Sequence, residues 1–227
     1  ALSGTVGGIS DLYLVDVSSG TARQLTNDRY GDLQPTWAPS GERLAFVTDR
    51  GPDGTDFSSL RFGPPRLALI DVETGAVDPL RPFPRGQQHN PQFTPDGTGL
   101  YFISDHDGFK DLYHLDLISG RTARLTTLQT GVSGFTALSP ALSVAARSGR
   151  MMFSVFSDNE YSILSLAPGT IEARIAQGGR GPDGDEPPAL GPIVNPDTVG
   201  ADSLVAPAGV LPPWTGGGVI EEALQSP

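Results

Sequence analysis

The 227-residue sequence contains no cysteine, which excludes disulfide bonds, thiol chemistry and thiolate metal sites. No apolar run approaches the roughly 20 residues of a membrane-spanning helix. Basic residues are scarce, 15 against 26 acidic ones, and the formal net charge of −11 argues against nucleic acid or an anionic membrane surface as a ligand. No signal peptide is visible. Because the chain begins at Ala1 and not at a methionine, we expect a processed mature end or a fragment of a longer product.

Glycine and proline are abundant, with 29 and 21 copies. Because they are the poorest helix formers, the composition argues against a helical bundle and favours short strands joined by turns. Residues 168–227 hold 10 of the prolines and 11 of the glycines, and carry a net charge of −6. That composition is typical of a segment that cannot build its own core. We therefore predict a folded body over residues 1–167 and an extended, acidic Pro/Gly-rich arm over residues 168–227.

The predicted body contains an internal repeat. The string Asp-Leu-Tyr-Leu-Val-Asp at residues 11–16 returns in related form at residues 67–71 and 111–116. Four residues after the last aspartate of each copy there is a glycine, at Gly20, Gly75 and Gly120. The last two glycines are 45 residues apart, and a period near 45 with four short strands is typical of a β-propeller blade. The first interval is longer, because the polar residues 51–65 read as an insertion in one loop between strands.

A second motif alternates with the first. Residues 34–41 read Gln-Pro-Thr-Trp-Ala-Pro-Ser-Gly, and residues 90–97 read Asn-Pro-Gln-Phe-Thr-Pro-Asp-Gly. Pro-Ser-Gly and Pro-Asp-Gly favour tight turns between strands. The aromatic residue two positions before each turn, Trp37 or Phe93, is at strand spacing, so we expect both side chains to pack between neighbouring blades.

These motifs resemble the TolB-like β-propeller repeat, in which an aromatic residue, Pro-Asp-Gly, an apolar strand, Asp-Leu-Tyr and a closing Leu-Thr follow one another. The resemblance covers roughly residues 9–166 and is specific in two full repeats. A third copy departs from it, because Arg-Ser-Gly-Arg at residues 147–150 replaces Pro-Asp-Gly. The family implies a periplasmic or exported bacterial protein that serves mainly as a protein-interaction platform. It also includes the propeller part of some serine peptidases.

The number of predicted strands is small for a closed propeller. We expect roughly 12 strands, about three blades' worth, whereas propellers typically have four to eight blades. A partial propeller would leave edge strands that proteins normally pair or cover. Either further blades lie outside this chain segment or another chain covers the edges, and we favour the second.

Candidate catalytic and metal-binding residues are few. The string Gly-Val-Ser-Gly-Phe at residues 131–135 has the wrong spacing for a nucleophile elbow. The histidines, His89, His106 and His114, fall at repeat positions that the scaffold explains. Asp105 and Asp107 resemble half of a calcium loop, but the later bidentate acid is missing. We therefore predict no catalytic residue, no cofactor and no metal site.

Apolar side chains recur along the arm, and an extended peptide can lay such side chains into successive pockets of a partner. We predict that the partner-binding residues are Ile193, Val194, Val210, Leu211, Trp214, Val219 and Ile220. Tryptophan is among the residues most enriched at interface centres, which makes Trp214 the main candidate anchor. The alternative is that the arm folds back over its own body.

The sequence thus predicts an all-β, partial or partner-completed propeller that acts as a non-catalytic scaffolding subunit. We expect a periplasmic component docked on a larger membrane-associated complex, whose host function could be energy transduction, envelope assembly or transport. Its partners would be other protein subunits, not nucleic acid or a small-molecule substrate. The main alternative is the propeller fragment of a longer exported enzyme such as a serine peptidase. A ligand-binding propeller is a third possibility.

Overall fold

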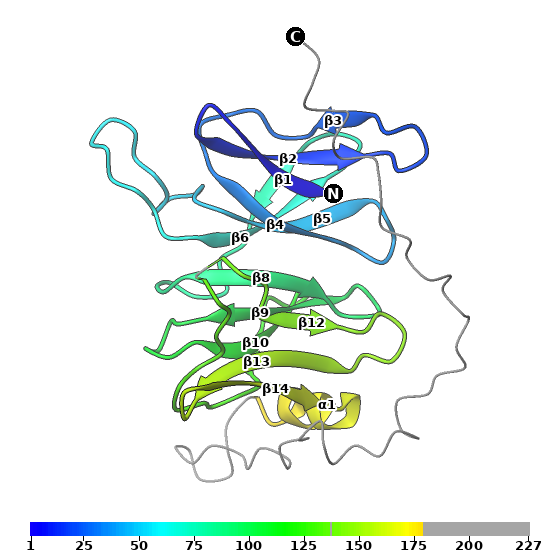
Figure 1. The fold of residues 1–227 in the computed structure, drawn as a ribbon, viewed down its shortest axis with the longest axis vertical. Helices are drawn as coiled ribbons and strands as arrows, with labels where there is room; N and C mark the ends of the chain where they lie inside the picture. The colour runs from blue at the N-terminus through cyan, green and yellow to red at the C-terminus, as the bar shows by residue number, and fades with distance from the viewer. Residues whose placement is uncertain (137, 179–227) are drawn as a thin grey trace. The chain divides into compact units, whose positions relative to one another are not determined.

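The computed structural model describes residues 1–136 and 138–178, which form four antiparallel sheets and one helix (Figure 1). We number the sheets in chain order. Sheet 1 contains β1 (Leu2–Val6), β2 (Ile9–Val15) and β3 (Ala22–Gln24). Sheet 2 contains β4 (Asp32–Trp37), β5 (Arg43–Thr48), β6 (Arg66–Asp71) and β7 (Val77–Pro79). Sheet 3 contains β8 (Gln88–Phe93), β9 (Gly99–Ser104), β10 (Asp111–Asp116) and β11 (Thr122–Arg124). Sheet 4 contains β12 (Leu142–Val144), β13 (Met151–Ser157) and β14 (Glu160–Leu166), followed by the helix α1 (Pro168–Ala176).

The all-β prediction is confirmed, and the two full repeats are sheets 2 and 3. The insertion predicted at residues 51–65 lies in the connection between β5 and β6. The strand that the sequence did not predict is β1, which pairs with β2 along its whole length. By comparison with sheets 2 and 3, the described part of sheet 1 has the second, third and fourth strands of a blade, and sheet 4 has the first three.

The repeated Asp and Gly of the first motif build the hairpin that follows each third strand. Asp16 Oδ1 accepts hydrogen bonds from the backbone N–H groups of Ser18 and Ser19, at 2.8 and 3.0 Å. Gly20 then adopts φ +71°, in the left-handed region that favours glycine. The same arrangement recurs after β6 and β10. A local sequence signal therefore sets these turns, which is why they can be recognised without the structure.

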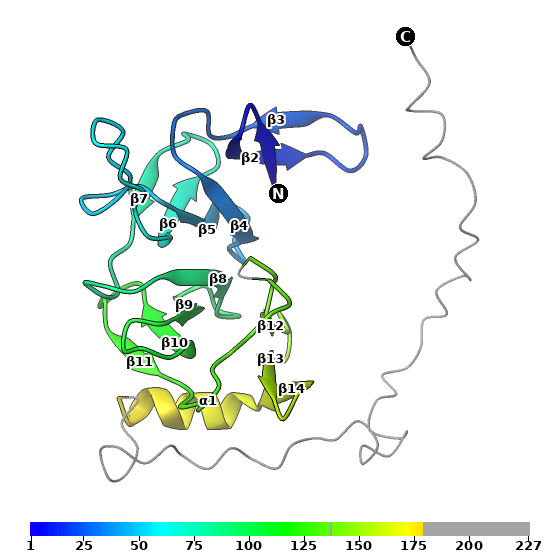
Figure 2. The ribbon, with the colours of Figure 1, turned by 60° about the vertical axis from the view of Figure 1, so that its left-hand side comes forward.

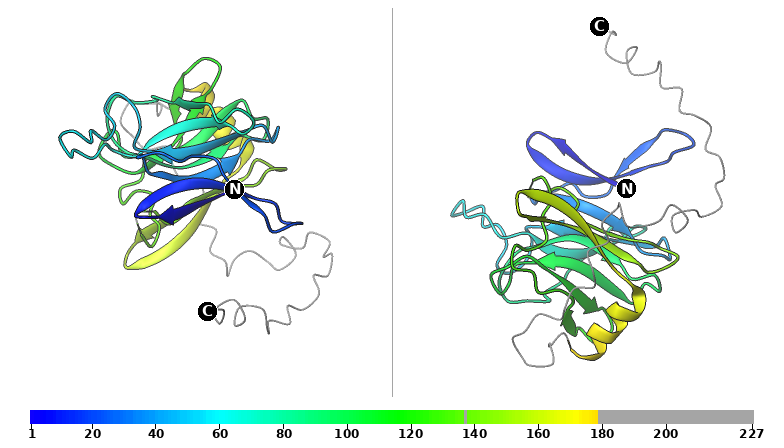
Figure 3. Two further views of the ribbon diagram at one scale, coloured as in Figure 1. Left: turned by 90° about the horizontal axis from the view of Figure 1, so that it is seen from above. Right: turned by 60° about the horizontal axis from the view of Figure 1, so that its bottom comes forward.

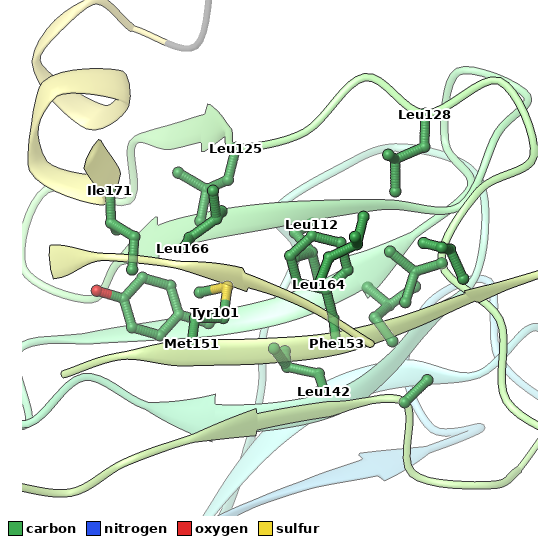
Figure 4. Packing of buried hydrophobic residues seen from close by; sticks show 14 residues of the cluster. Tyr101, Leu112, Leu125, Leu128, Leu142, Met151, Phe153, Leu164, Leu166 and Ile171 are labelled. Carbon is green, nitrogen blue, oxygen red and sulfur yellow. The ribbon is translucent and has the colours of Figure 1, made fainter. Parts of the chain in front are cut away.

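The sheets are held together by side chains that interdigitate between successive sheets. Sheet 3 packs on sheet 4 through a cluster that includes Leu112 on one side and Met151 and Phe153 on the other (Figure 4). Sheet 2 packs on sheet 3 through a cluster that includes Val47 and Phe102. A smaller cluster joins sheet 1 to sheet 2. Because each cluster draws on two sheets, each sheet depends on its neighbour for burial of one face.

Hydrogen bonds along the first strands connect sheets 2, 3 and 4. Gln34 and Asn90 occupy equivalent positions before a proline, and both have positive φ, +53° and +52°. Each lies at a register shift, in β4 and in β8. The Gln34 side chain accepts from the Asn90 N–H at 2.7 Å and donates to the Leu138 carbonyl at 3.0 Å. Asn90 Oδ1 accepts from the N–H groups of Ala141 and Leu142 at 2.7 and 2.9 Å. Each of these bulges therefore directs one side-chain amide, that of Gln34 or Asn90, towards the next sheet.

The arm prediction is wrong for its first nine residues, because Pro168–Ala176 form the helix α1. Proline suits the first helical position, because an N–H group there would have no acceptor within the helix and its absence costs nothing. Ile171 is buried in the cluster between sheets 3 and 4, and Arg174 donates to the Leu125 carbonyl. Packing on the sheets thus overrides the composition. The seven partner-binding residues predicted for the arm lie outside the described residues. No helix of the described residues has the length and apolarity to cross a membrane.

Candidate interaction surface

The three histidines pack within the sheets and their connections. His106 stacks on Phe83, with ring centroids 3.7 Å apart. His89 is buried in β8, where Nε2 lies 3.0 Å from the side-chain oxygen of Gln87. His114 is buried in β10. Burial lowers the pKa of each of the three imidazoles below its usual value.

The two aspartates of the calcium-like string are used within the scaffold. Asp107 forms an ion pair with Arg124 at 2.6 Å and accepts a hydrogen bond from the Tyr113 hydroxyl at 3.0 Å. Asp105 Oδ1 accepts from the Gln87 N–H at 2.6 Å. Within residues 1–136 and 138–178, no cluster of three or more histidine or acidic side chains is placed to hold a metal ion. The carboxylates therefore fix loops.

The two end faces of the sheet stack expose large apolar side chains that a soluble fold normally buries. In sheet 3 all six residues of β9 are buried, because this sheet packs on sheet 2 with one face and on sheet 4 with the other. In sheet 4 the residues of β13 alternate between buried and less buried. Only the face of sheet 4 toward sheet 3 contributes to a core cluster of the described residues. We call the opposite face the outer face of sheet 4.

The outer face of sheet 4 is apolar and aromatic. The cross-strand register places Phe156 opposite Tyr161 and Ser154 opposite Ile163. Tyr161 lies between two phenylalanines, with ring centroids 4.5 Å from Phe135 and 4.8 Å from Phe156. The large exposed residues of this surface are Phe135, Met152, Phe156, Tyr161 and Ile163. A contiguous exposed apolar surface is a signature of an interaction site.

The repeat shows which kind of surface this is. The register aligns β13 with β9 and β14 with β10, so that Ile163 of sheet 4 corresponds to Leu112 of sheet 3. Leu112 is 0% exposed because sheet 4 covers it, whereas Ile163 is 61% exposed. Met152 corresponds in the same way to the buried Tyr101. The outer face of sheet 4 thus has the residue positions of a sheet–sheet interface without a covering sheet among the described residues.

The outer face of sheet 1 has the same character at the other end of the stack. Leu2 pairs with Tyr13 as Phe102 pairs with Tyr113 in sheet 3. Phe102 is 0% exposed and Leu2 is 45% exposed. The exposed apolar residues on this face are Leu2, Val6, Ile9 and Val15. The two outer faces are therefore opposite sides of the same repeating interface.

One core prediction from the sequence is wrong. Phe93 is 7% exposed and packs between sheets 2 and 3, as expected, but Trp37 is 41% exposed. Trp37 pairs with Leu44, whose side chain packs on Leu12 of sheet 1, so Trp37 also faces sheet 1. The described part of sheet 1 has no counterpart of β4, the strand of sheet 2 that contacts β8, which carries Phe93. Trp37 is exposed because that strand position is vacant among the described residues.

Sequence reasoning placed the interaction surface in the arm and did not identify the outer faces. The apolar run at residues 151–156 indicates a strand, but it does not show which face is covered. The signal that could have found these faces is the repeat itself. An alignment of the strands of sheet 4 with those of sheet 3 places Ile163 on Leu112, and the absence of a following blade in the described body then leaves Ile163 uncovered.

Comparison with known proteins agrees with the fold. No family model matches the chain. The crystal structure of TolB from Acinetobacter baumannii superposes with a TM-score of 0.58 at 20% identity, covering 74% of this chain and 38% of TolB. The resemblance to the TolB-like propeller is thus confirmed at the level of the fold.

A peptidase and a TolB homolog are among the curated relatives that match parts of the chain. Dipeptidyl-peptidase 5 from Porphyromonas gingivalis is 26% identical over 127 residues, which are 56% of this chain and 18% of the relative. A TolB homolog from Chlorobium luteolum is 35% identical over 68 residues, which are 30% of this chain and 13% of the relative. The chain therefore matches less than a fifth of the length of either relative.

Proposed function

We propose that this chain is a non-catalytic protein-interaction body whose two outer faces are covered by further β-sheets in the functional assembly. The observation that carries the proposal is the contrast between equivalent positions. Leu112 is fully buried between sheets 3 and 4, and Ile163, at the matching position of sheet 4, is exposed. Covering such a side chain is worth about 1.5–3 kcal/mol, so several together form an effective docking surface.

In the finer form of the proposal, the body is a scaffolding subunit in the periplasm, docked on a larger membrane-associated complex. The TolB-like fold and the platform role that this resemblance implies support this form. A rigid set of sheets would fix the geometry, and the arm from residue 179 onward would bind a neighbouring subunit through the predicted anchors. The net charge of −11 favours neutral or basic surfaces for the bulk of the contact.

A second candidate is the propeller part of a longer exported peptidase. The match to dipeptidyl-peptidase 5 favours it, because it covers 56% of this chain but only 18% of that enzyme. In this case the covering sheets would come from the same polypeptide. The two candidates agree on the outer faces and differ in the origin of the partner.

Site-specific photo-cross-linking in the natural host separates these outcomes. A chain carrying p-benzoylphenylalanine in place of Ile163 is irradiated in cells, and the cross-linked peptides are identified by mass spectrometry. The matched control carries the same group in place of Ile118, which is exposed in a hairpin turn away from the outer faces. We expect cross-links at position 163 to apolar residues of a β-strand, and few at position 118.

The identity of the cross-linked strand decides between the candidates. A strand of another polypeptide supports the scaffolding subunit, and a strand beyond residue 227 of the same polypeptide supports the peptidase propeller. Equal yields at positions 163 and 118, or cross-links confined to the described sheets, would refute the proposal that the outer face is covered.

A further inference from the structure

We propose that the insertion between β5 and β6, residues 49–65, is a docking finger that binds an apolar pocket flanked by carboxylates on a partner protein. The equivalent connection in sheet 3 takes only residues 105–110. The extra length is thus not needed to join the two strands. Figures 1 and 2 show this cyan segment projecting beyond the ends of the sheets, and it projects in both views of Figure 3 as well. We call residues 49–65 the finger.

The neck of the finger is fixed by hydrogen bonds and by close backbone contact. Thr55 donates from its N–H to the Asp49 carbonyl at 2.8 Å and from its hydroxyl to the Asp49 carboxylate. The Gly63 N–H donates to the Thr55 hydroxyl at 3.0 Å. Gly54 and Gly63 touch, because a Cβ at Gly63 would lie 2.4 Å from the Gly54 carbonyl carbon. Only glycines allow this approach, so the neck is narrow and held in one conformation.

The turn of the finger satisfies its own polar groups. Asp56 and Arg61 exchange two backbone hydrogen bonds, at 2.8 and 3.1 Å. Asp56 accepts hydrogen bonds from the hydroxyls of Ser58 and Ser59, both at 2.6 Å. These bonds, that from the Ser58 side chain above all, hold the pKa of Asp56 well below its usual range. The turn therefore keeps its shape without help from a partner.

The finger is held against neighbouring loops on one side. The rings of Phe57 and Tyr30 meet edge to face at 5.3 Å, and the guanidinium of Arg29 lies 5.7 Å from the Phe57 centroid. Asp53 forms an ion pair with Arg81. These contacts fix the direction in which the finger points.

The segment Leu60–Phe62, which we call the tip, displays two large apolar side chains. Leu60 is 76% exposed and Phe62 is 82% exposed. Leu60 also has φ +54°, a conformation that residues other than glycine, asparagine and aspartate adopt at a cost. Glycine or asparagine would relieve that cost, and the exposed leucine side chain gains nothing from the fold that offsets it. Backbone strain with an exposed apolar side chain is the pattern expected where the side chain has a partner.

Charge indicates the kind of partner. Arg61 lies between Leu60 and Phe62, is exposed, and has no carboxylate within 4 Å of its side chain among the described residues. The three acids of the finger have partners within the described residues, Asp49 in Thr55, Asp53 in Arg81 and Asp56 in the serines of the turn. Among the residues that the structure describes, Arg61 is therefore a cation without an ion-pair partner between two exposed apolar side chains, in a chain of net charge −11. An apolar pocket with flanking carboxylates complements it, whereas the acidic chain as a whole is repelled by an anionic lipid surface.

The test uses the full-length protein in its natural host, with p-benzoylphenylalanine in place of Phe62. The matched control carries the group in place of Phe109, which is exposed in the short equivalent connection of sheet 3. We expect a cross-linked peptide from another protein, with apolar residues flanked by Asp or Glu. The yield should fall about tenfold with Arg61→Glu, because the charge at the tip is reversed. Lysines in place of the partner's flanking acids should restore it.

A second variant tests the role of Leu60 without loss of fold. Leu60→Asn should lower the yield at position 62 and raise the Tm by about 2–4 °C, because asparagine tolerates positive φ. A Tm that falls would show that Leu60 serves the fold, and would overturn this part of the argument. Ile163→Lys should leave the cross-linking yield at position 62 unchanged. The proposal for the finger and the proposal for the outer face can therefore be refuted separately.

Four results would refute the finger proposal. They are adducts with lipid, adducts with this chain or a second copy of it, yields no higher than those at position 109, and yields insensitive to Arg61→Glu.

Discussion

Replacing Asn90 should cost more stability than replacing its neighbour Gln92, because the Asn90 side-chain oxygen accepts hydrogen bonds from two buried backbone N–H groups of the next sheet. Asn90→Ala leaves the N–H groups of Ala141 and Leu142 without an acceptor. Each unsatisfied buried donor costs about 1–2 kcal/mol in this setting. Alanine at φ +52° adds about 1 kcal/mol relative to asparagine. We therefore expect Asn90→Ala to lower the free energy of unfolding by about 3–5 kcal/mol.

Urea unfolding followed by circular dichroism measures the loss, and amide hydrogen exchange locates it. Exchange should accelerate at Ala141 and Leu142 more than in sheet 2. Asn90→Gly removes the acceptor but tolerates the positive φ, so it should be less harmful than alanine by about 1 kcal/mol. The matched control is Gln92→Ala in the same strand, whose side-chain amide donates only to the Pro91 carbonyl, and it should cost less than about 1 kcal/mol. A cost for Asn90→Ala no larger than that of Gln92→Ala would refute the reasoning.

Two further predictions concern sheet 4 and the turn after β2. Phe153 faces the core and Met152 the outer face, so Phe153→Ala should cost about 3–5 kcal/mol in urea unfolding and Met152→Ala less than about 1 kcal/mol; similar losses would show that both faces are covered. The Ser18 hydroxyl, followed by neighbouring backbone N–H groups, lowers the pKa of Asp16 from 3.8 to about 2. Because the pKa of Asp16 is lower in the folded state than in the unfolded state, its ionised carboxylate stabilises the fold fully above pH 3.8, and this stabilisation is lost as the pH falls towards about 2. Asp16→Ala should therefore flatten the decline of Tm between pH 3.8 and about 2. An unchanged profile of Tm against pH contradicts this.

The sequence was sufficient for the features that local chemistry decides. Asp16 and Gly20 define a hairpin by their own hydrogen bond and φ value, and the same pair at each repeat reveals the third and fourth strands. The insertion at residues 51–65 was visible because the repeat period is broken there. Sheets 2 and 3 could therefore be placed from the repeat alone.

Other features depend on partners distant in the sequence. β1 lacks the motif residues and becomes a strand by pairing with β2. The helix Pro168–Ala176 forms in a glycine- and proline-rich segment because Ile171 is buried in the hydrophobic cluster between sheets 3 and 4. Trp37 and Phe93 occupy equivalent positions, but among the described residues only the strand of Phe93 contacts a first strand in the preceding sheet. Equal sequence signals thus give unequal burial when the neighbouring sheets differ.

The exposed apolar surfaces of the described body have two distinct origins. The outer faces, with Leu2 at one end and Ile163 at the other, are exposed because a repeating sheet buries each face only against another sheet. The finger around Leu60 and Phe62 is exposed although its neck and turn already satisfy their polar groups. Covering an outer face should therefore raise the stability of the body, since it completes an interface of the same kind as those inside. Covering the finger should order only the two side chains at its tip, and its contribution should appear in association with a partner and not in the stability of the fold.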